Sequence, residues 1–124
     1  MDTALRIDKE QVQGNVPVTV FHLHGWLDAQ GESALLASAR DAYDEGARFL
    51  LLDLAGVDTL TSAGMRAMQK VYKIFNSEGS DANSMRVKLC NAPPQVYHVL
   101  GITGFLQNIP NYETREAAIS SFKE

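Results

Sequence analysis

The run "RFLLLDLAG", residues 48–56, constrains the fold of this chain more than any other segment. Its apolar residues are consecutive rather than alternating, which is typical of a strand buried on both faces of a parallel sheet. The chain has 124 residues, of which 45% are hydrophobic, so it can bury a core without disulfide or metal support. We therefore place this run at the centre of an α/β sheet, in a single domain spanning residues 1–124.

The segment before this run is predicted to form an antiparallel hairpin. Leu5 and Ile7 alternate with polar residues, as in a half-buried strand. The pair Gly14-Asn15 suits a tight hairpin turn, and "VPVTVFHLHGWL" after it is rich in β-branched and aromatic residues. These two strands should therefore be antiparallel neighbours.

Apolar residues at helical spacing occur both before and after the central run. Residues 29–46 repeat apolar positions with a helical period and end at Gly46, a plausible stop; the positions are Leu35, Leu36, Ala39, Ala42 and Tyr43. A second helix is predicted to start near Ser62, with a buried stripe of Met65, Met68, Tyr72 and Phe75. A polar loop, Asn76 to Ser84, should follow this helix.

The last third of the chain continues the alternation. "MRVKLC" is predicted as a strand, and Pro93-Pro94 should open a third helix whose buried face carries Val96, Val99 and Leu100. An extended piece at 108–110 precedes a final helix in 113–124, with Ala117, Ile119 and Phe122 available for docking. The order β-β-α-β-α-β-α-β-α predicts a mostly parallel sheet with right-handed crossovers and about four helices.

Two polar segments are predicted to meet at one edge of this sheet. "GWLDAQG" follows the second strand and "DTLTSAGM" follows the third. In parallel sheets the carboxyl ends of the strands form the functional edge, so both segments should face the same patch of surface.

The hydroxyls of Thr61 and Ser62 have two interpretations. Either could cap the second helix by accepting from its first amides, which contributes about 1 kcal/mol. However, Gly64 in the first turn weakens a helix by up to about 1 kcal/mol relative to alanine, which a sequence selected only for helix initiation would avoid. The glycine makes sense if another backbone or side chain must approach closely. A phosphate on Ser62 would also be tolerated, because helix N-termini favour anions.

Other polar residues have ordinary structural interpretations. Asp28 is best explained locally as the N-cap of the first helix, and a functional role requires it to lie beside Ser62. His22 and His24 should share one face of a strand, and a metal site would need a third ligand that the sequence does not supply nearby. We interpret Asp53 as a hydrogen-bonded structural carboxylate near a strand end, and Cys90 as a small core residue.

Several classes of function are disfavoured. The sequence contains none of the phosphate-binding, metalloprotease, nucleophile-elbow or paired-cysteine motifs that would indicate an enzyme, and it suggests no cofactor. The net charge of −4 argues against nucleic acid as a partner. The sequence shows no signal peptide or membrane-spanning stretch, and the single cysteine fits the cytoplasm.

The motifs resemble those of the STAS domain, which anti-sigma-factor antagonists and sulfate-transporter tails share. "GWLDAQG", "LLLDLAGVDTLTSAGM" and "PPQVYHVLGITGFL" carry the resemblance, which extends from about Leu5 to Phe122. The most specific element of the family is an apolar strand and a short turn, followed at the helix start by Asp-Ser-Ser-Gly-Leu or a close variant, which "TSAGM" matches in part.

The resemblance implies an antagonist that binds an anti-sigma factor and is switched off when that partner, also a serine kinase, phosphorylates it. A PP2C-type phosphatase is a further implied partner. The matching phosphorylated residue is Ser62, with Thr61 as the alternative, because Thr61 stands where the family usually has an acid and Ala63 replaces a second serine. The implied partner-binding residues are Asp28, Thr61, Ser62, Gly64 and Met65.

Two alternatives stay open at this stage. Some stand-alone STAS proteins bind the ATPase of a lipid-transporting ABC system, and "TSAGM" partly matches their motif. The other is a receiver-like domain in which Asp53 accepts the phosphate, although "HGWLDAQ" supplies only one of the two acids that such a site needs.

Overall fold

A computed structural model describes residues 4–76, 86–107 and 109–123. Its elements, in chain order, are β1 Arg6–Gln13, β2 Pro17–Leu27, α1 Ala29–Asp44, β3 Leu50–Leu60, α2 Ser62–Phe75, β4 Val87–Cys90, α3 Pro94–Ile102, the 3-10 helix η1 Phe105–Gln107, β5 Asn111–Tyr112 and α4 Arg115–Ser121. This order of strands and helices confirms the predicted alternation, with η1 as the addition.

The strands form one five-stranded sheet in the order β1-β2-β3-β4-β5. β1 and β2 are antiparallel, and the pairs β2-β3, β3-β4 and β4-β5 are parallel. The hairpin turn lies at residues 14–16, as the Gly14-Asn15 pair predicted. The predicted mixed α/β sheet is therefore confirmed.

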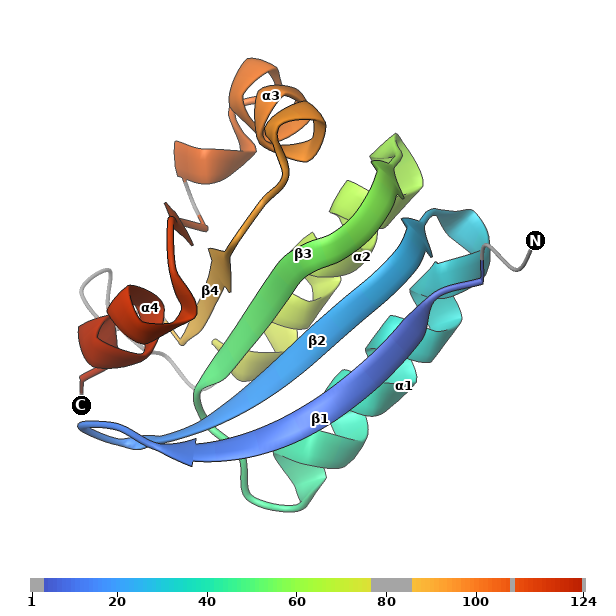
Figure 1. Ribbon diagram of the computed structural model, residues 1–124. Helices are drawn as coiled ribbons and strands as arrows, with labels where there is room; N and C mark the ends of the chain where they lie inside the picture. The colour runs from blue at the N-terminus through green and yellow to red at the C-terminus, as the bar shows by residue number, and fades with distance from the viewer. Residues whose placement is uncertain (1–3, 77–85, 108, 124) are drawn as a thin grey trace.

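Helices cover both faces of the sheet, but unequally (Figure 1). α1 and α2 lie side by side behind β1, β2 and β3, and the main apolar core lies between these helices and the sheet. α4 covers the other face near the amino ends of the central strands, where Phe122 packs in a smaller cluster. Leu51 belongs to this smaller cluster, whereas Leu50 and Leu52 belong to the main core. The central run is thus buried on both faces, as predicted.

Three details of the C-terminal half differ from the sequence expectation. The last strand is Asn111–Tyr112 rather than 108–110, because Asn111 and Tyr112 are the residues that pair with Leu89 and Cys90 of β4. α4 begins at Arg115, which leaves Ala117 exposed and buries Ala118 beside Ile119. In α2, Met65 and Tyr72 are only partly buried, and the buried face is instead Gly64, Ala67, Met68, Val71 and Phe75. Most of the predicted loop, residues 77–84, lies outside the described residues.

β3 is longer than the apolar run that predicted it. His22 pairs with Asp53, but His24 pairs with Gly56, so β3 carries an extra residue between the two pairs. A second irregularity follows between Gly25 and Trp26. Bulges of this kind increase twist and redirect a strand. β3 consequently continues to Leu60 and leaves a single residue before α2 begins.

Beyond α4, the face opposite α1 and α2 carries a polar network centred on His22. Its Nδ1 lies 2.7 Å from Asp53 and its Nε2 lies 2.9 Å from Glu10. Arg115 of α4 lies 2.6 Å from the same Glu10 carboxylate, which ties α4 to β1. Burial alone would lower the pKa of His22, but the hydrogen bonds and charges of Glu10 and Asp53 outweigh it and raise the pKa.

Asp53 is a hydrogen-bonded carboxylate, as predicted, although it lies within β3 rather than near its end. It also accepts from the Ala55 amide at 3.0 Å and the Asn91 side chain at 3.3 Å. Cys90 is fully buried beside it, which confirms the core interpretation. Burial and the nearby Asp53 charge raise the pKa of the Cys90 thiol to about 12.

Candidate functional site

The two hydroxyl residues at the start of α2, Thr61 and Ser62, have different roles. Thr61 is the N-cap: its backbone is extended and its Oγ1 accepts from the Gly64 amide at 3.2 Å. The same oxygen lies 3.5 Å from the Leu27 carbonyl, to which it can donate. Ser62 is the first helical residue and is exposed. The structure therefore assigns the capping role to Thr61, and Ser62 has no part in it.

The Leu27 carbonyl joins the two predicted segments. It accepts from the Thr61 amide at 3.1 Å, which fixes the start of α2 against the end of β2. Gly64 packs directly over the same carbonyl, and a β-carbon at this position would collide with it. The sequence led us to expect that another backbone or side chain approaches Gly64 closely, and the structure contains such a contact. The glycine is buried, and the group that approaches it closely is the backbone of Leu27.

Asp28 and Ser62 line one hollow at the carboxyl edge of the sheet. We call it the Asp28 hollow; its lining residues are Trp26, Asp28, Ala29, Gln30, Thr61, Ser62 and Ala63. Asp28 caps α1, since its Oδ1 accepts from the Gly31 amide at 3.1 Å. The side chain of Trp26, which is 40% exposed, adds an apolar wall that the sequence analysis did not single out. The two predicted segments do face the same patch of surface.

A second hollow lies on the other side of Ser62. We call it the Arg66 hollow; it is lined by Ser62, Met65, Arg66, Gln69, Thr103, Gly104 and Phe105. Met65 is partly buried there, and the Thr103 hydroxyl lies 3.5 Å from its sulfur. Arg66 could have been found from its spacing, four residues after Ser62 on a helix. Thr103 to Phe105 lie within a segment that carries the family resemblance, but no spacing along the chain indicated that they lie beside α2, because tertiary packing brings them there.

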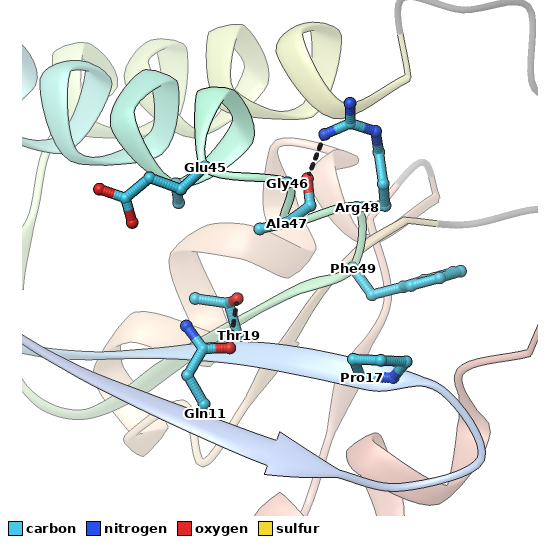
Figure 2. Close-up of a pocket in the computed structure, with 9 residues that line it drawn as sticks. Gln11, Pro17, Thr19, Glu45, Gly46, Ala47, Arg48 and Phe49 are labelled. Atoms are coloured by element: carbon cyan, nitrogen blue, oxygen red, sulfur yellow. Dashed lines mark hydrogen bonds between the residues drawn. The ribbon is translucent and has the colours of Figure 1, made fainter.

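A further hollow, of about 430 Å³, lies at the opposite end of the sheet (Figure 2). It is lined by residues of β1, the start of β2, the end of α1 and the segment that leads from α1 into β3. Two of its polar side chains make hydrogen bonds within the protein: Thr19 donates to Gln11 at 3.1 Å, and Arg48 donates to the Ala47 carbonyl at 2.7 Å. We therefore assign the candidate site to the edge that carries Ser62.

The chemistry available at this edge is that of an exposed hydroxyl. Neither hollow beside Ser62 contains a histidine or lysine that could activate it as a nucleophile. Among the described residues, no group of three or more His, Cys, Asp or Glu side chains is arranged to hold a metal ion. Nor does any described helix combine the length and apolar character needed to cross a bilayer. The group that this edge presents to solvent is thus the hydroxyl of the exposed Ser62.

Comparisons with known proteins agree on one family. The STAS domain pattern matches residues 6–118. BtrV of Bordetella bronchiseptica, named as a candidate anti-sigma factor antagonist, is 33% identical over 101 residues, which cover 82% of this chain and 83% of that protein.

Two solved structures share the fold. An anti-sigma factor antagonist from Mycobacterium paratuberculosis superposes with a TM-score of 0.82 at 20% identity, covering 100% of this chain and 98% of that one. The Bacillus cell fate determinant SpoIIAA, in its phosphorylated form, superposes with a TM-score of 0.64 at 18% identity, covering 91% and 96%. With the sequence match over most of its length, the chain belongs to the STAS domain family.

Proposed function

We propose that this protein is an anti-sigma factor antagonist of the bacterial cytoplasm, switched by phosphorylation of Ser62. Its unmodified form binds an anti-sigma factor that is also a serine kinase, and the phosphorylated form is released. A PP2C-type phosphatase restores the binding form. The names of the relatives support the antagonist part of this role: BtrV is named as a candidate anti-sigma factor antagonist, and the Mycobacterium protein is named as an anti-sigma factor antagonist.

The observation that carries the proposal is the exposed Ser62 hydroxyl at the start of α2, which does not cap the helix. Ser62 is exposed, whereas the Thr61 oxygen is engaged with the Gly64 amide and lies beside the Leu27 carbonyl. Ser62 is therefore favoured over Thr61 as the acceptor. A phosphate would add about −1.5 to −2 charges to an interface built around a neutral hydroxyl. The surface that binds the anti-sigma factor comprises Asp28, Thr61, Ser62 and Met65. Gly64 is buried and contributes by holding the start of α2 against Leu27.

The receiver-like alternative gains no support from the geometry around Asp53. The Asp53 side chain is only 11% exposed, and His22 lies 2.7 Å from one of its oxygens. An acceptor carboxylate must be reachable by a phosphodonor. A phosphate bound to Asp53 would also be acid-labile, whereas phosphoserine survives acid.

The test uses histidine-kinase-like ATPases encoded in the same genome. Each is incubated with the protein and ATP, and the modified residue is mapped by mass spectrometry. We expect phosphate on Ser62, none in Ser62→Ala, and undiminished labelling in Thr61→Ser. Ser62→Ala should still bind the kinase, and Ser62→Asp should bind it more weakly.

Modification on Thr61 would move the acceptor by one residue. If a verified partner kinase modified neither hydroxyl, the switch would be refuted. Capture of an ABC-transporter ATPase in place of a kinase would favour the transporter alternative.

A further inference from the structure

Ser62 lines two hollows whose charged residues are opposite in sign. It is the residue that the Asp28 hollow and the Arg66 hollow share. The charged residue lining the first is an aspartate, and the charged residue lining the second is an arginine. A group attached to the Ser62 oxygen can turn toward either side, and a dianion would be repelled on one side and attracted on the other.

Helix geometry brings Arg66 within reach of Ser62. Residues four apart on a helix are neighbours, with β-carbons about 5–6 Å apart. Helical side chains also lean toward the N-terminus, so a long side chain at position 66 covers the turn that begins at Ser62. The hollow between them has a volume of about 350 Å³. That is roughly ten times the share of volume that one water molecule takes, so a phosphate group fits with its hydration.

Arg66 makes only a long, solvent-exposed ion pair with Glu32. Its Nε lies 3.9 Å from the Glu32 carboxylate, beyond hydrogen-bonding distance, and its side chain is 60% exposed. Glu32 has a second cation, because Lys70 Nζ lies 3.5 Å from its other oxygen. Arg66 can therefore leave Glu32 without depriving this carboxylate of a counter-charge.

We propose that the phosphate on Ser62 enters the Arg66 hollow and pairs with the Arg66 guanidinium of the same chain. This inference rests on the proposed function for the phosphate itself. A guanidinium matches phosphate in a planar, two-pronged geometry. Pairing fills the space between α2 and η1, so the modification changes the shape of the partner surface as well as its charge.

The test needs no kinase, because phosphoserine is placed at position 62 by genetic encoding. The phosphate is titrated by ³¹P NMR in three otherwise identical proteins: the parent, Arg66→Gln and Arg66→Lys. A nearby cation favours the dianion, so Arg66→Gln should raise the titration midpoint by about 0.3 pH units, the size expected of an exposed ion pair. Arg66→Lys should restore much of the shift. Lys73→Gln removes the same charge farther along α2 and should leave the midpoint unchanged.

Amide chemical shifts report which hollow the phosphate occupies. Comparison of the serine and phosphoserine proteins should show changes at Thr103 and Gly104 that exceed those at Ala29 and Gln30. Equal midpoints in the parent and Arg66→Gln, or changes centred on Ala29 and Gln30, would overturn the inference. These outcomes are separate from the proposed function, which fails instead if a verified partner kinase leaves Ser62 unmodified.

Discussion

Replacing His22 with glutamine should destabilise the protein most in mildly acidic solution and less as the pH rises. Both imidazole nitrogens face carboxylates, with Nδ1 at 2.7 Å from Asp53 and Nε2 at 2.9 Å from Glu10. Only the protonated ring can donate to both. Although burial opposes the charge, these two partners raise the pKa of His22 above its usual value of 6.5.

The sign of the pH dependence follows from this raised pKa. The folded protein holds the His22 proton more tightly than the unfolded chain, so protonation stabilises the fold. This contribution is complete below the unfolded pKa, at about pH 6 and lower. It is lost as the pH rises through the higher, folded pKa. The gap in unfolding free energy between the parent and His22→Gln should therefore narrow as the pH rises from about 6 through the raised pKa of the folded protein.

The loss of unfolding free energy in His22→Gln should lie between the values known for exposed and for buried ion pairs. Exposed ion pairs contribute about 0–1 kcal/mol, and breaking a fully buried pair costs about 3–5 kcal/mol. The side chains of His22 and Asp53 are 27% and 11% exposed, and that of Glu10 is 40% exposed. Discounting for this exposure, we expect His22→Gln to cost about 2 kcal/mol near pH 6. The cost should fall below about 1 kcal/mol once the parent ring is neutral.

Urea unfolding followed by circular dichroism at a series of pH values measures this gap directly. His24→Gln is the matched control, because His24 lies on the same strand and face but pairs with the exposed Asp8 at 3.3 Å. The control should cost less than about 0.5 kcal/mol throughout. A gap for His22→Gln that stays constant, or widens with rising pH, would refute the argument that His22 is held as an imidazolium.

Three further predictions concern the packing around α2 and β4. Thr61→Ala should lower the unfolding free energy by about 1 kcal/mol in urea titrations, whereas Ser62→Ala should change it by less than about 0.5 kcal/mol, because only Thr61 caps the helix. Equal losses would contradict this division of roles. Gly64→Ala should cost more than about 2 kcal/mol, because the added β-carbon collides with the Leu27 carbonyl; a neutral effect in the same titration would contradict this packing. Cys90 should react with a thiol reagent at neutral pH only after unfolding, since its pKa is raised to about 12, and rapid labelling of the folded protein would show otherwise.

The sequence by itself determined the order of elements and the place of the central strand. Leu50, Leu51, Leu52 and Leu54 are all fully buried, and only a strand covered on both faces buries consecutive apolar residues in this way. Hydrophobic period and turn residues are local properties, so they predicted the hairpin at Gly14-Asn15 and the start of α2 near Ser62. The same locality placed Asp28 and Ser62 after neighbouring parallel strands, at one edge of the sheet.

Tertiary structure alone decided which groups at that edge have which role. The sequence left the cap of α2 open between Thr61 and Ser62, and the contact of Thr61 with the distant Leu27 carbonyl distinguishes them. Gly64 is explained by the same long-range contact, which no local pattern reports. The bulges of β3, the network around His22 and the approach of η1 to Arg66 likewise join residues far apart in the chain. Such contacts depend on strand register and on the packing of helices against the sheet, whereas sequence periodicity records only which face of each element is apolar.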